Sequence, residues 1–116
     1  MPGFPVGFTL NIALDDRYEQ LASAFQLEQV RLLRESLSQN GITGDLAREI
    51  CEKFTFDLGV LFDQGDLKVA GGIYRPQLLF SEDGHTCYAD NGEVALREMT
   101  FGSIEDSFST AHPELQ

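Results

Sequence analysis

Basic residues are scarce in this chain. Its 116 residues include 8 lysines and arginines against 19 aspartates and glutamates, which gives a formal net charge of −11. A protein that binds nucleic-acid phosphates needs clustered Lys and Arg side chains, and an anionic membrane surface would repel this chain. The composition therefore excludes nucleic acid and membrane surfaces as expected partners and favours a basic protein partner.

Long apolar runs and a rich supply of cysteine are lacking as well. No stretch is long and apolar enough to span a bilayer, and residues 1–14 have no basic segment of the kind that opens a secretory signal. The two cysteines, Cys51 and Cys87, are expected to be free thiols. These features predict a cytoplasmic protein.

Groups that bind metals or phosphates are few and poorly placed. His85 and Cys87 share one face of a predicted strand, but a zinc site needs several converging ligands. Asp63 and Asp66 lack the other oxygen ligands of a calcium loop, and no Lys-Ser or Lys-Thr pair follows Gly71-Gly72 to complete a phosphate loop. The sequence predicts no metal, no cofactor and no catalytic residue.

The first half of the chain predicts a strand followed by two or three helices. Apolar residues alternate over 6–14, as in a strand with one apolar face. Helical patterns follow over residues 18–25 and 23–37. Ser23 and Gln26 match a capping box, which predicts that a second helix begins there, and Asn40-Gly41 is a typical helix end. The pattern after Thr43 fits a helix to about Phe62, although residues 54–62 also alternate as a strand would; the apolar arc of the helix favours the helical interpretation.

The second half predicts antiparallel strands. Gly71-Gly72, Asp83-Gly84 and Asn91-Gly92 each tolerate the backbone of a tight hairpin turn. They separate strand candidates at 67–70, 73–80, 85–90 and 93–101, with a short helix over 93–99 as the alternative for the last. We therefore expect a single compact α+β domain over residues 1–108, in which a four-stranded antiparallel meander packs against the helices, and a frayed tail over 109–116.

A helix over residues 46–62 places a second apolar patch on its polar side. Phe56 and Val60 lie together there among Glu49, Glu52 and Asp63. An apolar pair ringed by acids suits a basic protein partner or a second copy of the chain. The leading hypothesis is a small acidic interaction module of the inhibitor or immunity type, and a homodimer is another use of this patch.

The alternative hypothesis is a small-ligand-binding or enzymatic domain. Its pocket would lie between the helices and the sheet, with Tyr74, Arg75, His85 and Asp57 as the polar groups. Nothing in their spacing specifies a reaction.

Overall fold

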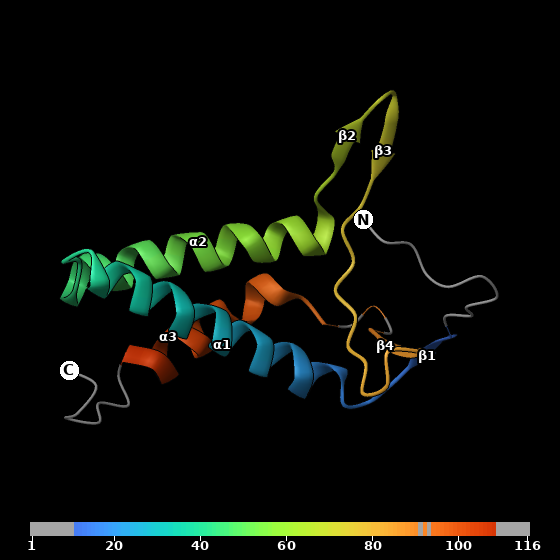
Figure 1. Cartoon of the computed structure of the whole chain (residues 1–116), viewed down its shortest axis with the longest axis horizontal. Coiled ribbons are helices and arrows are strands. Elements are labelled where there is room, and N and C mark those ends of the chain that lie inside the picture. Colours follow the sequence, from blue (N-terminus) through green and yellow to red (C-terminus); the bar gives the residue numbers. More distant parts are fainter. Residues whose placement is uncertain (1–10, 91, 93, 109–116) are drawn as a thin grey trace.

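Two long antiparallel helices dominate the computed structural model, which describes residues 11–90, 92 and 94–108 (Figure 1). They are α1, Tyr18–Gln39, and α2, Gly44–Gln64. The turn between them includes Gly41, whose φ of 81° is the left-handed conformation that closes many helices. The predicted helix end at Asn40-Gly41 is confirmed.

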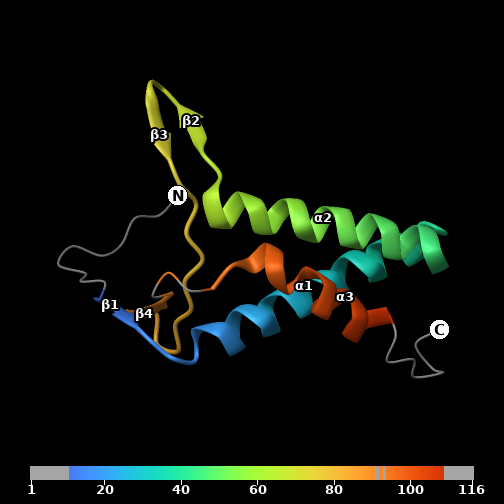
Figure 2. The same ribbon diagram turned by 180° about the vertical axis from the view of Figure 1, so that it is seen from behind.

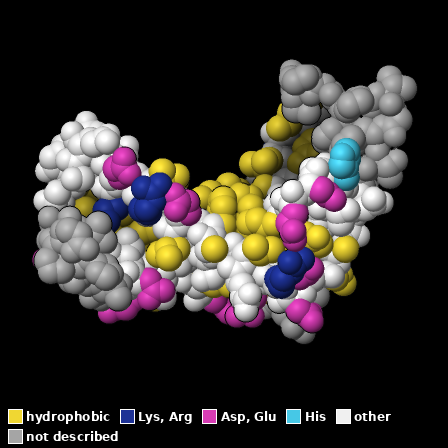
Figure 3. Space-filling view, turned by 60° about the horizontal axis from the view of Figure 1, so that its bottom comes forward, with side chains coloured by type: hydrophobic (Ala, Val, Ile, Leu, Met, Phe, Trp, Pro, Cys, Tyr) yellow, Lys and Arg dark blue, Asp and Glu magenta, His cyan; other side chains and the backbone are white. Residues whose placement is uncertain are grey.

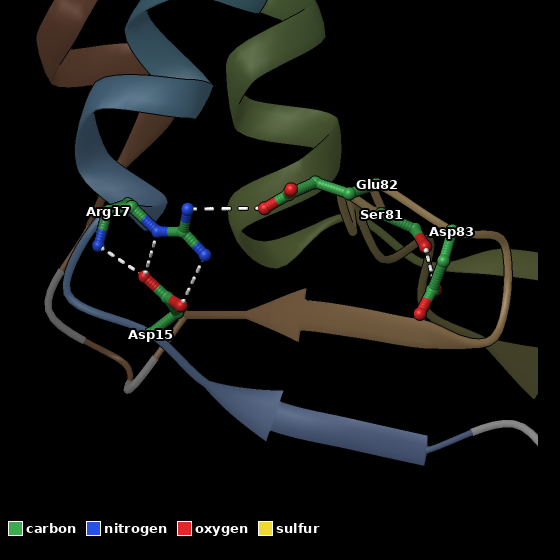
Figure 4. Close-up of polar contacts among 5 residues, drawn as sticks. All are labelled: Asp15, Arg17, Ser81, Glu82 and Asp83. Carbon is green, nitrogen blue, oxygen red and sulfur yellow. Dashed lines mark hydrogen bonds and ion pairs between the residues drawn. The ribbon is translucent and has the colours of Figure 1, made fainter.

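Helix α1 is continuous, so the predicted restart at Ser23 is wrong. Its buried residues fall on every fourth position, which keeps one stripe facing inward without a break: Tyr18, Ala22, Gln26 and Val30. The chain enters the helix through Asp15, whose carboxylate accepts hydrogen bonds from the Arg17 backbone N–H at 2.7 Å and from the Arg17 guanidinium at 3.0 Å (Figure 4). Arg17 also reaches Glu82 at 3.2 Å.

Helix α2 confirms the helical interpretation of residues 46–62. Its buried positions also recur every four residues and are occupied by small side chains: Ala47, Cys51, Thr55 and Gly59. Small residues let another segment approach the helix axis closely. A Cβ on Gly59 would lie only 2.7 Å from the backbone nitrogen of Arg97, so this glycine allows the later chain to pack directly on α2.

A third helical layer packs on one side of the α1–α2 pair, as the rear view shows (Figure 2). It consists of the short 3₁₀ helix η1, Leu96–Met99, and α3, Thr100–Phe108. The buried Gln26 side chain of α1 donates to the Leu96 carbonyl at 2.9 Å and accepts from the Ser103 hydroxyl at 2.6 Å. Val30, Cys51 and Ile104 form the apolar core between these helices.

The strands form two separate pairs. Strand β1, Asn11–Leu14, pairs in parallel with β4, Thr86–Ala89, and β2, Leu67–Val69, pairs antiparallel with β3, Gly72–Tyr74. An isolated antiparallel bridge joins Phe80 to Tyr88. The β2–β3 hairpin stands away from the helices at the end of α2 (Figure 1).

The class is α+β, but the predicted four-stranded antiparallel meander is not formed by the described residues. Residues 75–79 contain Pro76, which lacks a backbone donor, and they form no ladder. Residues 96–108 are helical, so the predicted strand over 93–101 is wrong. The alternative prediction, a short helix over 93–99, is nearer to the structure. Phe80 and Tyr88 pair around the Asp83-Gly84 turn, whereas β4 takes β1 as its ladder partner.

The first hairpin turn also lies one residue earlier than predicted. Ala70 and Gly71 occupy its two central positions, with φ of 48° and 81°, and Val69 pairs with Gly72. Two positive φ values match a primed hairpin turn. The predicted strand residues before Asn11, the tail at 109–116 and Asn91 of the third turn lie outside the described residues.

Candidate interaction surface

The polar side of α2 carries the apolar pair predicted from the sequence. Phe56 is exposed and Val60 is half-buried, with Glu49 exposed and Glu52 half-buried beside them. Residues three, four and seven apart share a face of a helix, so the helical conformation of residues 44–64 brings these four side chains together. Neither Glu49 nor Glu52 forms an ion pair with a described residue.

Asp63 shares this side of α2 but serves a different purpose. Its side chain is only 9% exposed. The carboxylate accepts hydrogen bonds from the backbone N–H of Leu96 at 2.9 Å and of Arg97 at 3.0 Å, and from the Arg97 guanidinium at 3.1 Å. A carboxylate engaged in this way fixes the start of η1 on α2, so it is not available to a basic partner as Glu49 and Glu52 are.

Phe101 extends the apolar patch onto α3. The Gly59–Arg97 approach at one end and the 2.8 Å ion pair between Arg48 and Glu105 at the other show that α3 runs antiparallel to α2. Phe101 falls between these two contacts, one turn before Glu105, and is 62% exposed. Residues four apart share a helix face, so Phe101 faces α2 as Glu105 does, and Glu52 and Phe56 continue the row of α2 that begins at Arg48.

We call this surface the acidic seam and define it by the residues it unites: Phe56, Val60, Phe101, Glu49 and Glu52. The sequence did not reveal Phe101 because the pattern over residues 93–101 predicts a strand. In a helix that begins near residue 100, positions 100, 103 and 104 face inward and position 101 falls at the edge of that face. The signal was present in the sequence, but it required the correct secondary structure.

A cleft of about 400 Å³ opens on another part of the molecule. It lies between the start of α1, the end of α2, residues 77–79, the end of β4 and the start of η1. Its polar side chains are Tyr18, Asp63, Gln64, Gln77, Asp90 and Arg97. The Tyr18 hydroxyl donates to the Leu78 carbonyl at 2.6 Å, and Asp90 accepts from the Val94 N–H at 3.1 Å. Burial raises the pKa of the Tyr18 phenol, and the charges of Asp90 and Asp63 add to the rise.

The four residues predicted for a ligand pocket do not line this cleft. Tyr74 and Arg75 are exposed on the β2–β3 hairpin, where Arg75 pairs with Asp66 at 3.3 Å. His85 is exposed in the turn before β4. Asp57 pairs with Lys53 at 2.9 Å on the outer surface of α2. The structure thus brings Tyr74 and Arg75 together and leaves His85 and Asp57 elsewhere.

The described residues provide little for metal or membrane chemistry. No group of three or more His, Cys, Asp and Glu side chains within them is arranged to hold a metal ion. No helix in the same part of the chain combines the length and the apolar character needed to cross a bilayer. Cys51 is buried, and burial raises the pKa of its thiol, which makes it a poor nucleophile.

Comparison with known proteins gives no match: no family model fits the chain, and neither the curated proteins nor the solved structures yield a similar one.

Proposed function

We propose that this chain is a small acidic interaction module of the inhibitor or immunity type, which covers a basic and apolar surface of another protein with its acidic seam. The observation that carries the proposal is the exposure of two aromatic side chains at one seam, 62% for Phe101 and 39% for Phe56. Exposed aromatic side chains that cluster among charges are typical of interface centres.

The charges around the seam support a basic partner over a neutral one. Arg48 and Glu105 neutralise each other at its far end, while Glu49 and Glu52 contribute uncompensated negative charge. The chain as a whole carries a formal net charge of −11, which surrounds the seam with a negative field. Such a field steers a cationic partner and speeds its association, whereas affinity depends mainly on the desolvated aromatic residues.

A defined probe tests the proposal. We suggest a synthetic amphipathic helical peptide with leucine on one face and lysine on the other, and its scrambled isomer, titrated by fluorescence anisotropy. Phe101→Ser should weaken binding of the amphipathic peptide by about tenfold. Glu49→Gln together with Glu52→Gln should weaken it most at low salt, because screening already suppresses the electrostatic contribution at high salt.

Two controls give the experiment its meaning. Leu14→Ser removes an exposed leucine of β1, far from the acidic seam, and should leave the affinity unchanged. The scrambled peptide keeps the charge but has no continuous leucine face. It should therefore bind wild type more weakly than the amphipathic peptide does, and its binding should not respond to Phe101→Ser. Equal binding of both peptides, or binding of the amphipathic peptide that does not change with Phe101→Ser, would show that the acidic seam is not the binding surface.

A ligand-binding or enzymatic role is the second candidate, and the 400 Å³ cleft is the observation that favours it. Its size is in the range of small-molecule sites, although most such sites are mainly apolar. Asp90→Asn alters the cleft without touching the acidic seam. Peptide binding that fell with Asp90→Asn and not with Phe101→Ser would favour the cleft.

A further inference from the structure

The β2–β3 hairpin leaves apolar side chains uncovered on an arm, which we define as residues 66–75. Val69 is 60% and Ile73 66% exposed, and Leu67 and Tyr74 are exposed as well. The register places Leu67 opposite Tyr74, so Leu67, Val69 and Tyr74 share one face of the hairpin. A two-stranded hairpin is marginally stable in water by itself, and among the described elements neither strand packs extensively against a helix.

A second uncovered apolar surface lies on the helices, and we call it the α1–α2 apolar face. Gln29 of α1 touches Thr55 of α2 at 3.2 Å, which marks where the two helices meet. The third layer packs on one side of this meeting line, through Gln26 and Gly59. Helical spacing places six apolar residues on the opposite side: Leu21, Phe25, Leu32, Ile50, Phe54 and Leu61.

Phe80 covers one edge of this face, because its ring centroid lies 6.2 Å from that of Phe25, but the middle of the face stays exposed. Leu32 is 55% and Phe54 49% exposed, although both are large apolar residues in the middle of long helices. The space-filling view shows apolar side chains gathered at the middle of the molecule, between two ends that carry charged side chains (Figure 3). Within one described chain, the arm and the α1–α2 apolar face are thus two separate surfaces, and each keeps large apolar side chains exposed.

We propose that the arm of one chain docks on the α1–α2 apolar face of a second copy, and that the exchange is reciprocal. Each copy supplies one arm and one apolar face, so two identical contacts close a two-fold dimer. Such a dimer covers both surfaces at once. This inference goes beyond the proposed function, because it uses neither the acidic seam nor a foreign partner.

Charge favours a second copy as the occupant. The arm contains Asp66, Lys68 and Arg75, a net charge of +1, which leaves −12 for the remainder of a chain of −11. Two such chains repel each other, so the arm is a part that can approach the other copy without that repulsion. Lys68 makes no ion pair with any described residue. The register places Lys68 opposite Ile73, on the other face of the arm from Val69, so it adds positive charge to the arm without facing the docked surface.

Sedimentation equilibrium of wild type and two single variants tests the exchange. Val69→Glu places a charge on the arm, and Leu32→Glu places one on the apolar face. Both positions are exposed in the single chain, so the helical circular dichroism should be unchanged. Each variant should weaken the dimer by about tenfold or more, since a carboxylate would be buried at both contacts. Leu14→Glu, an exposed leucine outside both surfaces, is the matched control.

A mixture of the two variants gives the decisive result. In the mixed dimer, the intact arm of the Leu32→Glu chain meets the intact apolar face of the Val69→Glu chain, so one of the two contacts is restored. The mixture should form more dimer than either variant alone. No such recovery would indicate contact of like with like, either arm to arm or face to face, and would overturn the proposal.

Other outcomes overturn it as well. A wild-type chain that stays monomeric at every concentration reached, or a dimer insensitive both to Val69→Glu and to a second arm variant, Tyr74→Glu, contradicts the exchange. Moderate salt should strengthen the dimer by screening the repulsion of two acidic chains. Binding of the basic peptide at the acidic seam should weaken in the same salt, so the failure of one proposal is distinguishable from the failure of the other.

Discussion

In the helical layers, polar groups contributed by distant segments meet inside the molecule, whereas in the β2–β3 arm apolar groups lie outside it. Gln26 joins Leu96 and Ser103 through two short hydrogen bonds, and Asp63 holds the backbone of η1. On the arm, Val69 and Ile73 expose most of their surface. The first region satisfies its polar groups within one chain, whereas the second leaves its apolar groups exposed.

This difference separates structural residues from candidate binding residues. Asp63 is an acid on the same side of α2 as Phe56, and the spacing along the helix predicts both as members of one interaction surface. Its three hydrogen bonds show that it supports the fold. A charged residue with internal partners should affect stability when changed, while exposed residues without such partners should affect binding and leave stability nearly intact.

Replacement of Asp63 should give the largest effect on stability. Asp63→Ala leaves the N–H groups of Leu96 and Arg97 without their acceptor in a partly buried position, and it should lower the free energy of unfolding by about 3 kcal/mol. Asp57→Ala breaks an exposed ion pair on the same helix and should cost less than about 0.5 kcal/mol. Urea unfolding followed by circular dichroism measures both. Equal losses would show that Asp63 does not anchor η1.

A methyl group at Gly59 should have the next largest effect. The added Cβ would lie 2.7 Å from the Arg97 nitrogen and 2.8 Å from its Cα. Because backbone cannot rotate aside, α2 and η1 must separate, and Gly59→Ala should cost about 2 kcal/mol. Gly102→Ala is the matched control, since its Cβ meets nothing within 4 Å and a helical alanine gains about 0.5–1 kcal/mol over glycine. Opposite signs in thermal unfolding would confirm the close contact.

Local patterns sufficed to predict the two long helices of the fold, but not α3, where the pattern over residues 93–101 predicts a strand. Apolar spacing indicated a helix near residues 44–64, and Asn40-Gly41 marked the end of the preceding one. Both signals depend on residues within a few turns of each other. The continuity of α1 past Ser23 was missed, because a capping pattern in the sequence does not break a helix whose buried stripe continues through Ala22, Gln26 and Val30.

Strand pairing depended on distant residues and could not be predicted in this way. Asn11 pairs with Thr86 in parallel, and no turn residue signals a partner so far along the chain. The candidate surface shows the same limit. The pairing of Phe56 with Val60 followed from their spacing along α2. Phe101 joins them only because α3 packs antiparallel on the same helix. Asp63 is not part of the surface, because its carboxylate is bound to the backbone N–H groups of residues 96 and 97.

The smallest predicted effect concerns the turn before β4, whose hydrogen bonds also lie within one chain. Asp83 accepts hydrogen bonds from the backbone N–H groups of His85 and Thr86, both at 2.8 Å, and from the Ser81 hydroxyl at 3.2 Å (Figure 4). The Thr86 and His85 amides lower the pKa of its carboxyl. Folding therefore favours the ionised form, and the resulting stability is present above the unfolded pKa of about 4 and is lost as the pH falls through the lower folded value.

Asp83→Asn isolates the contribution of that charge, because the amide oxygen can still accept from the turn. The variant should be slightly less stable than wild type at pH near 7, and the difference should shrink as the pH falls below about 4. Urea midpoints across this range measure it, with Glu49→Gln as the control for loss of one negative charge at an exposed helical site. A difference that stayed constant with pH, or grew in acid, would show that the ionised carboxylate does not stabilise the turn.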